Sequence, residues 1–218
     1  MPKIVTFIGW HDSGKTTLVS QVVRHLKETG YQVAVIKSSE ETSIAFDTPG
    51  TDSYKHRQAG ADSVLFVAPD QMVMMTENRQ EPLTTLAHRY FADVDIVIGE
   101  GFKTASGVAK IEVARDPKQK LRESEKGVIA VATDLPIEYD CLFDINDSRV
   151  IADFIKNHFL ADAAPRGPKK TMLWVNGCSV PLKSFVQDAL SKTVAGFVKS
   201  LNGTEDAREI EVKINVSS

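Results

Sequence analysis

The sequence predicts an α/β fold in which helices cover a mostly parallel β-sheet. Apolar runs typical of buried strands, at residues 4–8, 32–36, 95–100 and 128–133, alternate with segments whose apolar residues recur at helical spacing. A glycine-containing segment, residues 9–17, joins the first run to the first helical segment. A strand, a helix and a second strand at these lengths form a right-handed βαβ crossover, so we expect the strands to be parallel.

Residues 9–17 read Gly-Trp-His-Asp-Ser-Gly-Lys-Thr-Thr and match the phosphate-binding pattern G-x-x-x-x-G-K-[ST]. The glycines let backbone N–H groups turn toward phosphate oxygens, and the N-terminus of the next helix adds positive partial charge. Lys15 is expected to reach the outer phosphates and the Thr16 hydroxyl to bind Mg²⁺. The pattern predicts a three-layer P-loop NTPase domain over residues 1–160. The loop residues expected to bind nucleotide are Gly9, His11, Asp12, Ser13, Gly14, Lys15, Thr16 and Thr17.

Composition narrows the classes of partner. The chain has 218 residues, of which 42% are hydrophobic and 25% charged, and a net charge of −3, so neither nucleic acid nor an anionic membrane is expected to bind. Cys141 and Cys178 form no Cys-x-x-Cys pattern, which disfavours a cysteine zinc site and implies no disulfide. The first strand begins near Lys3 and no apolar run approaches the about 20 residues of a membrane span, so we expect a cytoplasmic protein.

The first helix is expected to stop at Gly30 and to be followed by the strand over 32–36. Residues 37–50 are polar and predict a loop, and residues 52–60 predict a short polar helix. Two apolar runs, 63–67 and 71–75, are expected to pair as neighbouring strands.

A helix over residues 82–91 begins with a proline, and a strand is expected over 108–114. Residues 116–126 predict a charged, solvated loop. Asn146 or Asp147 is expected to cap the last helix of this domain.

Glu100 ends an apolar strand and stands between two glycines in Gly-Glu-Gly-Phe-Lys, residues 99–103. Proteins with a phosphate-binding loop place at such a strand end the carboxylate that holds the magnesium shell or a water. We therefore predict that Lys15 and Glu100 are catalytic and that Thr16 and Glu100 are metal ligands. The alternative is a structural role for Glu100.

Two further carboxylates are candidates. Asp52 begins the polar helix and is predicted to bind magnesium or its waters, with an N-cap role as the alternative. Asp134 follows the strand over 128–133 and is positioned like a carboxylate that accepts from the N1–H and N2–H₂ groups of guanine. The chain contains no Asn-Lys-x-Asp motif to support that choice of base.

The composition shifts after the first domain. Residues 161–170 contain two prolines, a glycine and several charges, which predicts a linker. Residues 171–218 predict a small ββαβ unit: a hairpin around Asn176-Gly177, a helix ending near Gly203, and a strand with alternating apolar residues over 210–216. Because so small a unit leaves sheet edges open, we expect it to dock on its own domain, a second subunit or a partner enzyme.

Several segments in this order resemble the molybdopterin-guanine dinucleotide biosynthesis protein B family. They are residues 9–17, 52–61 (Asp-Ser-Tyr-Lys-His-Arg-Gln-Ala-Gly-Ala), 99–103, 109–111, 130–134 and 144–147. The resemblance runs from about residue 3 to residue 160, and residues 37–43 lack the histidines usual there in this family. It implies a dimeric protein that binds GTP and Mg²⁺, has weak GTPase activity, and assists the guanylyltransferase that attaches GMP to molybdopterin. The family also implies delivery of the cofactor to apo-molybdoenzymes.

Two other classes share the phosphate-binding loop. A small-molecule kinase needs a lid with arginines, whereas Arg115 and Arg122 are scattered. A metal-delivery GTPase needs clusters of Cys and His ligands, whereas the five histidines are dispersed. The sequence does not distinguish slow GTP hydrolysis from nucleotide binding alone.

Overall fold

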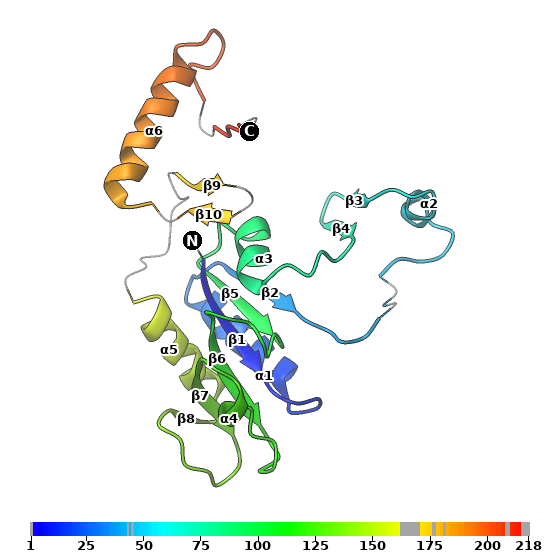
Figure 1. Ribbon diagram of the computed structural model, residues 1–218, viewed down its shortest axis with the longest axis vertical. Helices are drawn as coiled ribbons and strands as arrows, with labels where there is room; N and C mark the ends of the chain where they lie inside the picture. The colour runs from blue at the N-terminus through cyan, green and yellow to red at the C-terminus, as the bar shows by residue number, and fades with distance from the viewer. Residues whose placement is uncertain are drawn as a thin grey trace.

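A six-stranded parallel sheet forms the centre of the protein, and its strand order is β2-β5-β1-β6-β7-β8 (Figure 1). The structure is a computed structural model that describes residues 2–42, 44, 46–161, 171–175, 178–180, 182–207 and 210–214. The predicted α/β class with a parallel sheet is therefore confirmed. The strands of the sheet are β1 (Lys3–Ile8), β2 (Val33–Lys37), β5 (Ile96–Glu100), β6 (Ala109–Ala114), β7 (Val128–Thr133) and β8 (Leu142–Asp144).

Helices cover both faces of this sheet. Helices α1 (Lys15–Glu28) and α5 (Ser148–Phe159) pack side by side on one face, where their apolar stripes join Val5 and Phe7 of β1 in the main core. Helix α3 (Leu83–Tyr90) covers the other face, where Ala87 packs against β2 and β5. Central strands buried on both faces need continuous apolar sequence, which is why these strands were recognisable as runs.

The helix ends follow local chemistry. Asp147 caps α5, since its Oδ1 accepts from the Val150 N–H at 3.2 Å, as expected for one of the two candidate caps. Pro82 precedes α3, and helix α1 is followed by Gly30 in the left-handed region at φ +94°.

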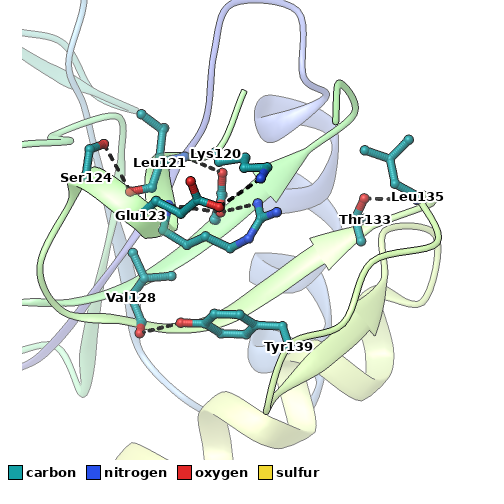
Figure 2. Close-up of polar contacts among 10 residues, drawn as sticks. Lys120, Leu121, Glu123, Ser124, Val128, Thr133, Leu135 and Tyr139 are labelled. Atoms are coloured by element: carbon teal, nitrogen blue, oxygen red, sulfur yellow. Dashed lines mark hydrogen bonds and ion pairs between the residues drawn. The ribbon is translucent and has the colours of Figure 1, made fainter. Parts of the chain in front are cut away.

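The prediction of a plain loop over 116–126 is wrong in part, because residues Leu121–Ser124 form the short helix α4. The buried carboxylate of Glu112 on β6 accepts from the Leu121 N–H at 2.8 Å and from the Arg122 guanidinium at 3.1 Å. A buried carboxylate needs such donors, so it holds the segment against the sheet. Figure 2 shows the turn around Leu121 and Ser124, and the Tyr139 hydroxyl that donates to Val128 O at 3.0 Å.

Residues 52–76 form an arm that projects from the sheet (Figure 1). It contains helix α2 (Asp52–Gln58) and an antiparallel hairpin of β3 (Ser63–Val67) and β4 (Met72–Thr76), so the predicted pairing is confirmed. Thr51 is the N-cap of α2 and accepts from the Tyr54 N–H, so the alternative N-cap role for Asp52 is wrong. We use "arm" below for residues 52–76.

The C-terminal part contains the hairpin of β9 (Leu173–Val175) and β10 (Cys178–Val180), followed by helix α6 (Ser184–Lys199). Strand β10 contacts α3, and the Trp174 ring lies edge-on to the His88 ring at 6.0 Å. The predicted turn at 176–177, linker residues 162–170 and the end of the predicted last strand lie outside the described residues.

The predicted strand over 210–216 is not formed by residues 210–214, the part of it that the structure describes. Val212 and Ile214 are exposed there, and the described backbone offers them no ladder partner. Alternating apolar sequence forms a strand only where a neighbouring edge accepts its hydrogen bonds. Among the described helices, none has the length and apolar character needed to cross a membrane.

Candidate nucleotide-binding site

The phosphate-binding loop connects β1 to α1, and close packing requires a glycine at position 9, whereas the backbone conformation favours one at position 14. A Cβ at Gly9 would lie 2.6 Å from both Ser13 Oγ and Val113 O, which is too close for any larger residue. Gly14 begins α1 with φ +88°, in the left-handed region. The first N–H groups of α1 are left at the helix N-terminus, where they are available to an anion.

The Lys15 ammonium lies over this loop. Its Nζ donates to Trp10 O and, at 3.2 Å, to Ser13 Oγ. Burial lowers the pKa of Lys15, Glu100 opposes that shift, and Lys103 and Lys37 add to it. The site thus gathers three lysines around one loop, as a polyphosphate ligand requires.

Thr16 and Glu100 are brought together although 84 residues separate them in the chain. The Thr16 hydroxyl donates to Glu100 Oε1, and the Glu100 side chain is only 7% exposed. The Lys37 ammonium completes the group at 3.1 Å from the same Oε1. A hydroxyl and a carboxylate are the hard oxygen ligands that Mg²⁺ prefers, and a cation already contacts them, so the residues present fit a magnesium ion.

Sequence reasoning missed Lys37. The polar sequence predicts that Lys37 begins a loop, whereas it is the last residue of β2 and the register partner of Glu100 on β5. Because side chains at the carboxyl ends of neighbouring parallel strands meet at one sheet edge, the strand order was the signal that would have found it.

A turn after β5 brings Lys103 to the loop. Gly101 at φ +94° and Phe102 at φ +53° reverse the chain, and the Gly101 N–H donates to Phe7 O at 2.9 Å. Lys103 Nζ then lies 4.8 Å from the centre of the Trp10 ring, a cation–π contact. The Gly-Glu-Gly-Phe-Lys segment therefore folds over the phosphate-binding loop from the β5 side.

Asp134 and Arg115 lie on the other side of the loop. Asp134 directly follows β7, and Arg115 directly follows β6, whose last residue Ala114 pairs with Thr133. The Arg115 Nε is 4.0 Å from Asp134 Oδ2, and its guanidinium lies within 4 Å of where a Cβ of Gly14 would stand. Arg115 thus connects the loop to the carboxylate predicted to bind guanine, a role that sequence reasoning did not assign.

Other predicted residues fall into two groups. Ser13 is buried within the loop, whereas Thr17 is exposed, and His11 and Asp12 form an exposed pair with Nδ1 and Oδ2 2.9 Å apart. Asp52 is not brought to Thr16 and Glu100. Its side chain is 88% exposed, its Oδ1 lies 2.9 Å from Lys55 Nζ, and the arm that carries it lies away from the loop in Figure 1.

Comparisons with known proteins place the chain in one family. Residues 4–134 match the family model described as "Molybdopterin guanine dinucleotide synthesis protein B". The "Molybdopterin-guanine dinucleotide biosynthesis adapter protein" of Escherichia coli (strain K12) is 35% identical over 163 residues, covering 71% of this chain and 92% of that protein. A protein of Methanocaldococcus jannaschii is 26% identical over 237 residues, covering 99% of this chain and 98% of that protein. The crystal structure of "molybdopterin-guanine biosynthesis protein B" superposes with a TM-score of 0.60 at 29% identity, covering 71% of this chain and 99% of that one.

Proposed function

Because this chain belongs to the molybdopterin guanine dinucleotide synthesis protein B family, we propose that it is a GTP-binding adapter of molybdopterin-guanine dinucleotide biosynthesis. The observation that supports nucleotide binding is the convergence of Lys15, Thr16 and Glu100 at the carboxyl ends of β1 and β5. A phosphate-binding loop at this end of a parallel sheet is the usual site for nucleotide in such folds.

In this proposal each loop residue has a separate task. The ammonium of Lys15 neutralises the β- and γ-phosphates, and the amides at the start of α1 bind their oxygens. Thr16 and Glu100 would hold Mg²⁺, and the metal would neutralise part of the phosphate charge. Asp52 is left out of the metal site because it lies on the arm, apart from these two side chains. We propose that Lys15, Thr16 and Glu100 support only weak hydrolysis of GTP.

The choice of guanine is assigned to Asp134. Its half-exposed carboxylate stands beside the loop and forms an ion pair with Arg115, whose Nε lies 4.0 Å from Asp134 Oδ2. A carboxylate that accepts from both guanine donors would discriminate against adenine, which presents an acceptor at N1 instead of a donor.

The partners that we propose are the molybdopterin guanylyltransferase, apo-molybdoenzymes and a second copy of this chain. The arm supports an interaction role because a two-stranded hairpin is marginally stable alone and exposes apolar side chains. The exposed apolar residues of the hairpin are Leu65, Phe66, Val67, Met72, Val73 and Met74.

Calorimetry of the purified protein with GTP, GDP, ATP and molybdopterin, each with Mg²⁺, tests this function. We expect GTP and GDP to bind and ATP to bind more weakly. Absence of guanine nucleotide binding by a folded protein would contradict the proposal. The proposed adapter role is tested separately by co-purification with a molybdopterin guanylyltransferase, with Lys15→Ala as the control for nucleotide dependence.

A further inference from the structure

Lys37 contacts both side chains to which we assign magnesium. Its Nζ lies 3.1 Å from Glu100 Oε1 and 3.5 Å from Thr16 Oγ1. The Thr16 hydroxyl donates to that same Oε1. A lysine ammonium therefore contacts the pair of oxygens that would hold a divalent cation.

The sheet itself holds Lys37 beside Glu100. The two residues are register partners on the neighbouring parallel strands β2 and β5. Pairing continues past the strand ends, since the Ser38 N–H donates to Glu100 O at 2.9 Å. Gly101 approaches so closely that a Cβ there would lie 3.1 Å from Ser38 Cβ. The register of β2 and β5 therefore keeps Lys37 next to Glu100, and the contact does not depend on a loop conformation.

An ammonium and a magnesium ion would repel each other strongly at these distances. The Lys37 side chain is 58% exposed, whereas that of Glu100 is 7% exposed, so the lysine is the group with room to move. The ammonium groups of Lys15 and Lys103 also lie near this site and repel that of Lys37. The site already concentrates positive charge around one buried carboxylate.

We propose that Lys37 is an internal substitute for the magnesium ion, which neutralises Glu100 in the metal-free protein and withdraws when Mg²⁺ enters with the nucleotide. This inference rests on the proposed nucleotide site. Two consequences follow from the charges. Without Mg²⁺, Lys37 shields the phosphates from the Glu100 carboxylate and supports nucleotide binding. With Mg²⁺, Lys37 competes with the metal and raises the concentration of Mg²⁺ that the site needs.

The test measures GTP affinity by calorimetry in EDTA and across a Mg²⁺ titration. Lys37→Met removes the charge and keeps an aliphatic side chain of similar length. We expect its ratio of Kd in EDTA to Kd in saturating Mg²⁺ to exceed that of the wild type by about tenfold to a hundredfold, the size of one charge-assisted hydrogen bond. The Mg²⁺ concentration for half-maximal enhancement of binding should fall.

Two variants serve as controls. Lys3→Met removes the same charge at the opposite end of β1, where Lys3 begins the strand, and should keep the wild-type ratio. Lys37→Arg keeps a cation beside Glu100 and should lie nearer to the wild type than Lys37→Met does. Thermal unfolding midpoints test whether the three variants are folded, which we expect because Lys3 and Lys37 are exposed.

The outcomes distinguish failure of the Lys37 proposal from failure of the proposed nucleotide binding. If the wild type binds no GTP in either condition, the proposed nucleotide site fails. If the wild type binds GTP and Lys37→Met keeps both the wild-type ratio and the wild-type Mg²⁺ requirement, the role of Lys37 is overturned and the nucleotide site stands. A changed ratio in Lys3→Met of the same size would also overturn it, since the effect would then be one of overall charge.

Discussion

The central sheet and the arm are both rich in apolar residues, yet only the sheet buries them. Phe7 on β1 is fully buried between α1, α5 and the neighbouring strands, whereas Phe66 on β3 is 49% exposed on a hairpin that lies apart from the sheet. The difference is the number of covering layers. The central sheet has helices on both faces, whereas among the described residues β3 pairs with β4 alone and has the short helix α2 beside it. Apolar sequence therefore predicts that a strand forms. Whether its side chains are buried, and so stabilise the fold, depends on the layers that pack against the strand.

The largest expected effect is the difference in stability lost when each of these two phenylalanines is replaced by alanine. Phe7→Ala should lower the free energy of unfolding by about 3–5 kcal/mol, because it leaves a cavity in the core. Phe66→Ala should lower it by less than about 1 kcal/mol when the protein is dilute enough to be monomeric. Urea unfolding of both variants measures the comparison. Equal losses at low concentration would show that the hairpin packs against a covering layer in the single chain.

The same pair of substitutions tests whether the arm binds a second copy of this chain. If the arm is an interface, the loss caused by Phe66→Ala should grow with protein concentration, while that of Phe7→Ala should persist at every concentration. Sedimentation of the wild type and of Phe66→Ala supplies the oligomeric state. A wild type that stays monomeric at high concentration contradicts the proposed homodimer.

The second effect lies at the loop. Lys15→Ala should weaken GTP binding by about tenfold to a few hundredfold, since a charge-assisted hydrogen bond contributes about 1.5–3 kcal/mol. The unfolding midpoint should change little, because the described hydrogen bonds of the ammonium run to atoms of the loop itself. Calorimetry and thermal unfolding measured together distinguish loss of the site from loss of the fold. Undiminished GTP affinity would rule out this loop as the phosphate site.

A smaller effect is expected at Asp134. Asp134→Asn replaces one acceptor oxygen by a donor facing the guanine donors, so the preference for GTP over ATP should fall by about tenfold or more. Competition binding with both nucleotides measures the preference. Arg115→Lys is the matched control for the neighbouring charge, because it keeps a cation beside Asp134 and leaves the carboxylate in place. A wild type without base preference would remove Asp134 from the site.

The smallest effect is expected from the C-terminal part. Truncation after Ala164 removes β9, β10 and α6, and the residues that we assign to the candidate site all precede residue 135. The GTP dissociation constant should stay within about twofold of the wild type, although loss of the Trp174 contact with His88 should slightly weaken α3. Calorimetry of the truncated chain decides this. Loss of nucleotide binding would show that the boundary near residue 160 cuts the nucleotide-binding fold.

Local sequence was sufficient for the main strands and helices of the first domain and for the residues of the phosphate-binding loop. The apolar runs of β1, β5 and β7, the loop motif with Lys15 and Thr16, and the Glu100 strand end were all readable, because each depends on neighbours within a few residues.

Only the tertiary structure decided which distant residues share the site. The order β2-β5-β1-β6-β7 sets Lys37 beside Glu100 and Arg115 beside Asp134, and it leaves Asp52 on the arm. It also decided that residues 210–214 remain without a strand partner among the described residues. The physical reason is that a strand or helix is specified by periodicity along the chain, whereas contacts between strand ends depend on sheet order, register and the layers that cover the sheet.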